Sequence, residues 1–151
     1  MTARAEALPW HQTPHWREPV ALAAMGPRLY VANQRSGSVT VLEAEKLRVL
    51  SETPVGRRLA DLALIERGTA LAAVDEAAHQ LLRLEPQGDG VRVTQRLDVS
   101  KYPVSTAADA TGTRMAVASL WSRRVTLVRS VASRESSRRI ETQAVIDLPF
   151  A

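Results

Sequence analysis

The sequence of 151 residues contains no cysteine. Without a thiol, the chain can form no disulfide bond, no thiolate metal site and no covalent attachment to a c-type haem. Exported proteins can also lack cysteine, so this absence does not decide the cellular compartment.

Long apolar runs are missing as well. A membrane-spanning helix needs roughly 20 consecutive apolar residues, and no stretch of the chain approaches that length. The first apolar run, PVALAAMG at 19–26, is too short for a signal peptide and follows the polar stretch HQTPHWRE. The chain as written is therefore expected to be cytoplasmic, unless its N-terminus is incomplete.

Lysine is almost absent, because 18 of the 20 basic residues are arginines and only Lys46 and Lys101 are lysines. The formal net charge of +4 suggests an anionic partner. However, 16 acidic residues are spread among the arginines, and aromatic residues are limited to three Trp, two Tyr and one Phe. Nucleic acid is not an expected partner, because there is no basic helix and no alternation of basic and aromatic side chains.

What the chain does contain is a repeat of about 42 residues. Gly26, Gly68 and Gly112 are separated by 42 and then 44 residues, and the same offsets align other columns. The aligned sets include Ala21, Ala63 and Ala107; Leu29, Leu71 and Met115; Asn33, Asp75 and Ser119; and Val39, Leu81 and Val125. A repeat of this period predicts an architecture of stacked or radial units.

Each repeat indicates four short strands, which in the first repeat are PVALAA, RLYVA, SVTVLE and LRVLSETPV. Four strands at this period are typical of one blade of a β-propeller. We therefore predict an all-β fold with three four-stranded antiparallel blades, at about 19–56, 57–100 and 101–148. They would form a partial propeller over 19–151, preceded by an N-terminal arm at 1–18.

Three motifs of the first repeat are distinctive: LYVAN at 29–33, GSVTVLE at 37–43 and TPVG at 53–56. With them, the chain resembles the YVTN family of propeller repeats over 19–148, in more degenerate form after the first repeat. The family includes surface proteins and propellers of bacterial cytochrome proteins. It is also similar to the propellers of haem-d1 nitrite reductases and sugar-lactone hydrolases. The resemblance implies an exported or periplasmic protein if the N-terminus is incomplete.

Closed propellers have four to eight blades, and this sequence supplies three. Three arrangements are open: a fragment of a larger propeller, two copies closing a six-bladed ring, or an open stack. The expected partners are therefore the remaining blades of the same propeller or a second copy, in addition to a separate protein partner.

Candidate catalytic or metal-binding groups are few. His11 and His15 have a spacing that would suit a metal site on a helix, but Pro14 opposes a helix and no third ligand is near. No Ser-His-Asp arrangement and no phosphate-binding loop can be assigned. We predict no catalytic residue, no metal site and no cofactor in this chain.

Asn33, Asp75 and Ser119 form a polar column of the repeat. Because the repeat places them equivalently, one interpretation is a ring of ligand-binding groups. Capping of turn amides is the favoured interpretation, since these residue types often end strands in that way.

The repeat also places equivalent turns and blade-to-blade connections on one edge of the propeller. The candidate binding residues in these segments are Arg35, Arg57, Arg58, Tyr102, Trp121, Arg123 and Arg124. Trp and Arg are enriched at the energetic centres of protein interfaces. We therefore predict a non-catalytic module that binds or scaffolds a protein partner. Packing of Trp121 on its own blade is the alternative use of that side chain.

The family resemblance leaves two other functions open. One is the propeller part of a bacterial c-type cytochrome or oxidoreductase, whose haem domain would lie outside this chain because no CxxCH motif is present. The other, less favoured, is a lactone hydrolase propeller, whose active site needs residues from several blades.

Overall fold

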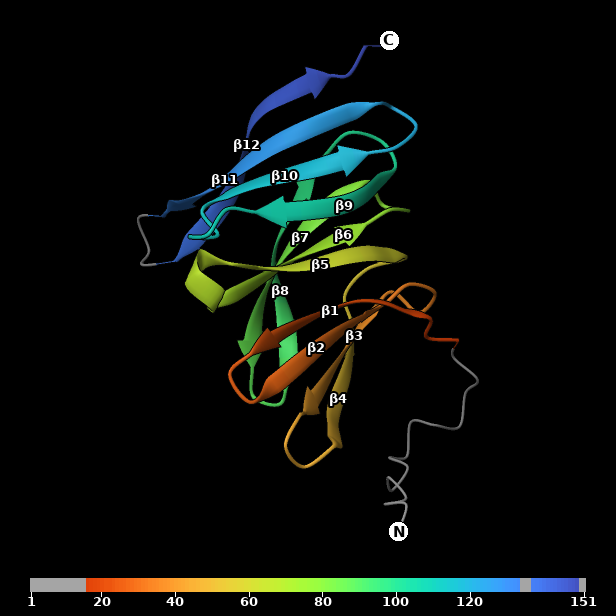
Figure 1. The fold of residues 1–151 in the computed structure, drawn as a ribbon, viewed down its shortest axis with the longest axis vertical. Coiled ribbons are helices and arrows are strands. Elements are labelled where there is room, and N and C mark those ends of the chain that lie inside the picture. Colours follow the sequence, from red (N-terminus) through yellow and green to blue (C-terminus); the bar gives the residue numbers. More distant parts are fainter. Residues whose placement is uncertain (1–15, 134–136, 150–151) are drawn as a thin grey trace.

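The computed structural model describes residues 16–133 and 137–149. These residues form three antiparallel four-stranded sheets (Figure 1). Within each sheet the strands follow chain order, so every strand pairs with the next one along the sequence. The prediction of an all-β fold with three four-stranded sheets is confirmed.

The three sheets are similar in the lengths and order of their strands. The first contains β1 (Pro19–Met25), β2 (Arg28–Asn33), β3 (Ser38–Glu43) and β4 (Arg48–Pro54). The second contains β5 (Leu59–Ile65), β6 (Ala70–Asp75), β7 (Gln80–Gln87) and β8 (Gly90–Asp98). The third contains β9 (Pro103–Ala108), β10 (Arg114–Ser119), β11 (Arg124–Ala132) and β12 (Arg138–Asp147).

Helical structure within the described ranges is limited to the three-residue 3-10 helix η2 (Glu66–Gly68), which joins β5 to β6. None of the helical structure in these ranges has the length and apolar character that crossing a membrane requires.

Strand pairing reproduces the columns of the sequence repeat. Leu29 lies opposite Leu42, Leu71 opposite Leu84, and Met115 opposite Val128. In every sheet the pairing of the third strand with the fourth shifts register just before the second member of these pairs. Because a bulge increases the local twist of a strand, the three sheets bend at the same repeat position.

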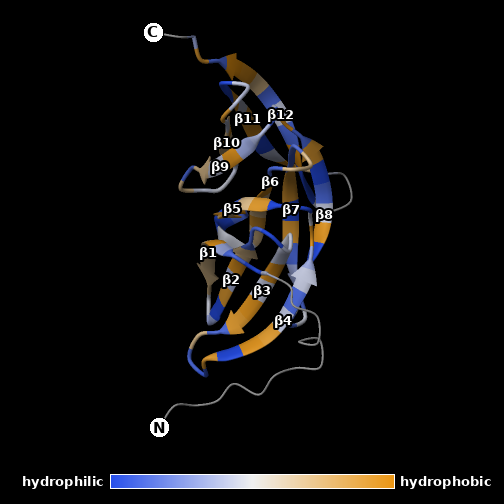
Figure 2. Ribbon diagram, turned by 90° about the vertical axis from the view of Figure 1, so that its right-hand side faces the viewer, coloured by the Kyte–Doolittle hydropathy of each residue, from blue (hydrophilic) through white to orange (hydrophobic). Residues whose placement is uncertain are grey.

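The sheets are stacked so that their first strands lie along one side and their fourth strands along the other (Figure 2). Of the first strands, β5 contacts both β1 and β9. Small side chains are frequent in these inner strands, whose sequences are PVALAAM, LADLALI and PVSTAA. Short side chains leave room for successive sheets to converge on that side.

Two apolar clusters hold the sheets together. The first cluster combines Tyr30 and Val41 of the first sheet with Leu71 of the second. The other cluster combines residues of the second and third sheets, among them Val74 and Val117. All six residues of β6 are buried, because its alternate side chains enter the two clusters.

Repeat positions that are buried between two sheets inside the stack are partly exposed on the outward faces of the first and third sheets. Leu71 is fully buried against the first sheet, whereas Leu29, at the same repeat position of the first sheet, is partly exposed. Leu81 is fully buried against the third sheet, whereas Val125, at the same position of the third sheet, is partly exposed. Each end of the stack therefore presents apolar side chains that no further sheet covers within the described ranges.

The turn of the third sheet that contains Gly112 docks on η2. The backbone amide of Glu66 donates to the carbonyl oxygen of Gly112 at 3.0 Å, and the amide of Arg67 donates to that of Thr111 at 2.8 Å. Gly112 has a φ of +64°, and a Cβ atom at this residue would lie 2.4 Å from the backbone nitrogen of Glu66. Gly26, its equivalent in the first sheet, also has a positive φ of +57°, but open space surrounds its Cβ position.

We expect Gly112→Ala to destabilise the protein more than Gly26→Ala. The change at Gly26 adds only the cost of a left-handed backbone, about 1 to 2 kcal/mol. The change at Gly112 adds a collision with η2, which we expect to cost at least about 1 kcal/mol more, as overpacking does. Chemical denaturation of both variants measures the difference. Equal losses would mean that the turn separates from η2 without cost.

Candidate functional site

One edge of the stack, here called the rim, gathers the turns β2–β3, β6–β7 and β10–β11 with the connections β4–β5 and β8–β9 (toward the right in Figure 1). The sequence-predicted binding residues Arg35, Arg57, Arg58, Tyr102, Trp121 and Arg123 lie in these segments. Arg124 lies beside them as the first residue of β11. The seven residues therefore share one edge, although they come from three different sheets.

Several rim arginines form exposed ion pairs. The pairs are Arg35 with Glu18 at 3.3 Å, Arg58 with Glu76 at 3.1 Å, and Arg124 with Asp147 at 2.6 Å. The guanidinium of Arg35 also lies 5.7 Å from the ring centre of Trp16, within the range of a cation–π contact. Exposed pairs of this kind contribute little to stability, so the rim arginines are not needed to hold the fold.

An apolar patch lies on the rim of the third sheet, and we call it the aromatic rim patch. It consists of Tyr102, Leu120 and Trp121, whose exposed fractions are 43%, 58% and 74%. The amide of Leu120 donates to the carbonyl oxygen of Tyr102 at 2.9 Å, which holds the turn against the connection. Because Trp121 is largely exposed, it does not cover its own blade.

Three residues with left-handed backbone conformations support this part of the rim. His79, Tyr102 and Arg123 have φ values of 59°, 58° and 53°. The carbonyl oxygen of each accepts an amide, from Val99, Leu120 and Leu148 respectively, at 2.9 to 3.0 Å. Such conformations cost about 1 to 3 kcal/mol and persist where the surroundings impose them. The imidazole of His79 adds a contact, because its Nδ1 accepts the amide of Tyr102 at 3.2 Å and the two rings meet edge to face at 4.9 Å.

The polar column has a structural role in all three sheets. The buried carboxylate of Asp75 accepts the amides of Arg57, Arg58 and Ala78 at 2.8 to 3.2 Å, so the prediction of amide capping is confirmed there. The other two members act differently. Asn33 donates to the hydroxyls of Ser38 and Thr40, and Ser119 donates to the carbonyl oxygen of Ser100.

Two cavities open on the rim at the junctions between successive sheets. The first, of about 590 Å³, lies at the junction of the first and second sheets, and its lining includes Val55, Gly56 and Gln80. The second, of about 460 Å³, lies at the next junction, and its lining includes Val99, Ser100 and Arg124. These residues are equivalent at the repeat offset of 44, so the fold forms the same cavity twice. We call them the first and second junction cavities.

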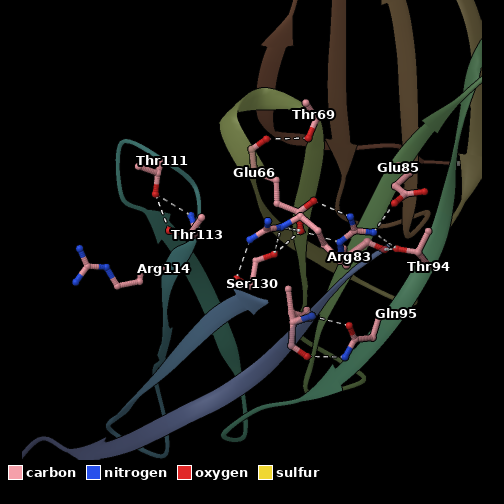
Figure 3. Close-up of polar contacts among 12 residues, drawn as sticks. Glu66, Thr69, Arg83, Glu85, Thr94, Gln95, Thr111, Thr113, Arg114 and Ser130 are labelled. Atoms are coloured by element: carbon pink, nitrogen blue, oxygen red, sulfur yellow. Dashed lines mark hydrogen bonds and ion pairs between the residues drawn. The ribbon is translucent and has the colours of Figure 1, made fainter. Parts of the chain in front are cut away.

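A buried ion pair of the second blade, which the sequence analysis did not identify, is joined to the third sheet by Ser130 (Figure 3). Arg83 of β7 donates from Nε to Oε1 of Glu66 at 2.9 Å and from Nη2 to Oε2 at 2.6 Å. Ser130 of β11 donates to the same carboxylate at 2.6 Å. The remaining Nη1 group of Arg83 contacts Glu85 at 2.6 Å and Thr94 at 2.7 Å. Four of the five N–H groups of the guanidinium therefore have acceptors inside the protein.

Opposing effects set the pKa of Glu66. Burial of the carboxyl group raises its pKa, but the hydrogen bonds from Arg83 and Ser130 and the charges of Arg83 and Arg138 lower it, and together they hold it below the ordinary value of 4.5. Glu66 is consequently ionised at neutral pH. The pair has a structural role, because the carboxylate already receives donors from both sheets.

The sequence did contain one signal for this pair. Arg83 stands in a column that is otherwise apolar, with Val41 and Leu127 at the equivalent positions of the other sheets. A charged residue in an apolar column requires a buried partner. Glu66 gave no comparable signal, because it lies in a turn.

No cluster of three potential metal-ligating side chains occurs among the residues that the structure describes. His11 and His15, the pair with a metal-like spacing, lie outside the described residues.

Comparison with known proteins identifies the architecture. No family model matches the sequence, and no curated protein matches it. Among solved structures, the chain is similar to the periplasmic gluconolactonase of Pseudomonas aeruginosa, with a TM-score of 0.75, 20% identity and coverage of 90% of this chain and 41% of that one. It is also similar to hydrazine synthase of Kuenenia stuttgartiensis, with a TM-score of 0.70, 16% identity and coverage of 85% and 36%.

A third similar structure is the β-propeller domain of Cps50 (Swd1) from Myceliophteria thermophila, with a TM-score of 0.66, 12% identity and coverage of 87% and 43%. The chain thus spans about two fifths of the length of the structures it matches. At these identities the likeness concerns the fold alone. The three sheets are blades of a β-propeller, as the sequence repeat predicted.

Proposed function

We propose that the three blades belong to a closed propeller and act as a non-catalytic module that binds a protein partner through the rim. The observation that carries this proposal is the aromatic rim patch, in which Trp121 is 74% exposed next to Arg123 and Arg124. Exposed aromatic and arginine side chains in one place are typical of the residues that dominate binding energy in protein interfaces. A guanidinium can pair with carboxylates and stack on aromatic rings, which suits an acidic protein surface.

We also infer that the repeats are of the YVTN type. Support comes from the first blade, where LYVAN forms most of β2 and the SVTVLE part of GSVTVLE forms β3. The alternative function is the propeller part of a cytochrome-containing protein of that family. Because the chain has no cysteine, a c-type haem in such a protein would be attached to another domain.

The open end faces support closure of the ring by further blades. Leu29 at one end and Val125 at the other are partly exposed, although their repeat equivalents are fully buried inside the stack. The three blades cover about two fifths of each longer chain that they match. Covering both faces in the same way would remove apolar surface from water at about 25 cal/mol per Å².

The proposed rim can be tested once a partner has been isolated with the wild-type protein and its affinity measured. We expect the double variant Trp121→Ala/Arg123→Ala to bind that partner at least tenfold more weakly, about 1.4 kcal/mol. The melting temperature should not change, because neither side chain is part of the two apolar clusters. Isothermal titration calorimetry and thermal denaturation provide the two measurements.

A matched control lies on the opposite edge of the stack. Leu47 is 82% exposed in the turn between β3 and β4, and Arg48 follows it, so Leu47→Ala/Arg48→Ala removes one exposed apolar side chain and the same charge. This variant should bind the partner like the wild type. Unchanged binding by the rim variant, or equal loss by both variants, would show that the rim is a solvated surface.

A lactone hydrolase is the second candidate, because the chain shares the fold of a gluconolactonase and the repeat resembles the propellers of such enzymes. The two candidates differ in a direct assay. Hydrolysis of gluconolactone by the ring that contains these blades, unchanged in Trp121→Ala/Arg123→Ala, would support the hydrolase. No hydrolysis together with partner binding through the rim would support the binding module.

A further inference from the structure

The lining of the first junction cavity includes two arginines that form no ion pair with a carboxylate of the described residues. Twelve arginines of the described ranges take part in ion pairs with Asp or Glu, and neither Arg57 nor Arg96 is among them. Both line this cavity. Nη2 of Arg96 donates to the carbonyl oxygen of Val55 at 2.7 Å, which fixes the guanidinium against the cavity wall.

The acidic residue in the lining does not compete for these guanidinium groups. The carboxylate of Asp75 is buried and already accepts three backbone amides, including that of Arg57 at 2.8 Å. By holding the backbone of Arg57, Asp75 fixes where this side chain leaves the connection. The formal charge of the lining is +1, from two arginines and one aspartate.

The second junction cavity has the opposite character, although the repeat makes it equivalent. Its charged lining residues are Asp98, Asp147 and Arg124, so its formal charge is −1. Nε of Arg124 is paired with Asp147 at 2.6 Å. The two cavities therefore lie at equivalent positions of the repeat and differ in charge. Only the first is lined by arginines that have no carboxylate partner within the described ranges.

We propose that the first junction cavity is a binding site for an oxyanion, the carboxylate or phosphate group of a ligand, held by Arg57 and Arg96. A volume of about 590 Å³ admits a small molecule or the side chains of a peptide. Guanidinium groups donate paired hydrogen bonds that match carboxylate and phosphate oxygens. This site is separate from the aromatic rim patch, so the inference does not depend on the proposed function.

The test uses inorganic phosphate and acetate as separate probes, each titrated into the ¹⁵N-labelled protein at constant ionic strength. We expect saturable shifts of the amide signals of Arg57 and Ala78 with at least one probe, and Arg57→Gln/Arg96→Gln should weaken that binding at least tenfold. Saturation with phosphate alone assigns the site to phosphate groups, and saturation with acetate alone assigns it to carboxylates.

The matched control is Arg58→Gln, which removes one positive charge from the same connection but does not line the cavity. It should leave the affinity within about twofold of the wild type, and Arg57→Gln should weaken binding although it removes the same charge. If Arg96→Gln unfolds the protein through loss of the bond to Val55, the comparison of Arg57→Gln with Arg58→Gln decides alone. The proposal is overturned if neither probe gives saturable shifts, or if Arg58→Gln weakens binding as much as Arg57→Gln.

Discussion

Replacing Leu71 with Ala is expected to lower the free energy of unfolding by about 2 to 5 kcal/mol, the range for a fully buried leucine. Leu71 of β6 has no exposed surface and belongs to the apolar cluster between the first two blades. Truncation leaves a cavity that the rigid sheet pair fills only in part, so the loss exceeds the transfer energy of the missing atoms. Urea denaturation of the two proteins, with equal m-values, measures the difference.

The repeat offers a control of the same residue type at the same register position. Leu29 of β2 has the repeat position of Leu71, but no preceding sheet covers it within the described ranges, and it is partly exposed. Leu29→Ala should therefore cost clearly less than Leu71→Ala. Equal losses would mean that the outward face of the first blade is covered in solution. That result would itself point to an additional blade or a second copy.

Arg83→Leu is expected to destabilise the protein by about 3 to 5 kcal/mol at neutral pH, because removing one partner of a buried pair leaves the other charge uncompensated. Leucine is the residue at the equivalent position of the third blade, Leu127, so the β-strand itself tolerates it. The double variant Glu66→Leu/Arg83→Leu should cost less than Arg83→Leu, since no buried carboxylate remains. A double variant that is less stable than the single one would contradict this account.

The same pair gives the protein a pH dependence of known sign. In the folded protein the pKa of Glu66 lies below its ordinary value of 4.5. A lowered folded-state pKa gives stability above the unfolded-state pKa, and that stability is lost as pH falls through the folded-state value. The wild type should therefore lose stability from this carboxyl group below about pH 4.5. In Arg83→Leu this part of the acid loss should disappear, so the gap between the two proteins narrows on acidification.

The repeat columns made most of the fold predictable. Glycines at 42 and 44 residue offsets located the first turn of each blade, and the columns through Leu71 and Leu81 fell on the buried faces. The conformation of η2 was not predictable in the same way. Glu66 and Arg67 have positive φ values because the turn docks on Gly112 of the next blade, and no local sequence rule includes that contact.

The sequence predicted which residues lie on the rim, but it did not predict the contacts that their side chains make there. Equivalent turns of stacked antiparallel sheets emerge on one edge, so the placement of Arg35 and Trp121 on the same edge follows from topology. The exposure of Trp121 depends on how its side chain packs, and the contact between His79 and Tyr102 depends on the joint between two blades. The unequal charges of the two junction cavities likewise depend on which side chains line each junction, among them Arg124 and Asp147, which lie opposite each other on β11 and β12.

Burial of β6 on both faces has a consequence for how the molecule opens. In a stack where each unit touches only its neighbours, the free energy of local opening is lowest at the ends and highest in the middle. Amide hydrogens of β6 should then exchange with solvent only when the whole stack unfolds, whereas those of β2 and β10 can exchange through fraying of one end blade. A ligand or a further blade that covers one end should slow amide exchange most in the blade it contacts. The effect should be smaller in the middle blade and smallest in the blade at the far end. The middle blade therefore opens only with global unfolding, whereas the stability of each end blade depends on what covers its outward face.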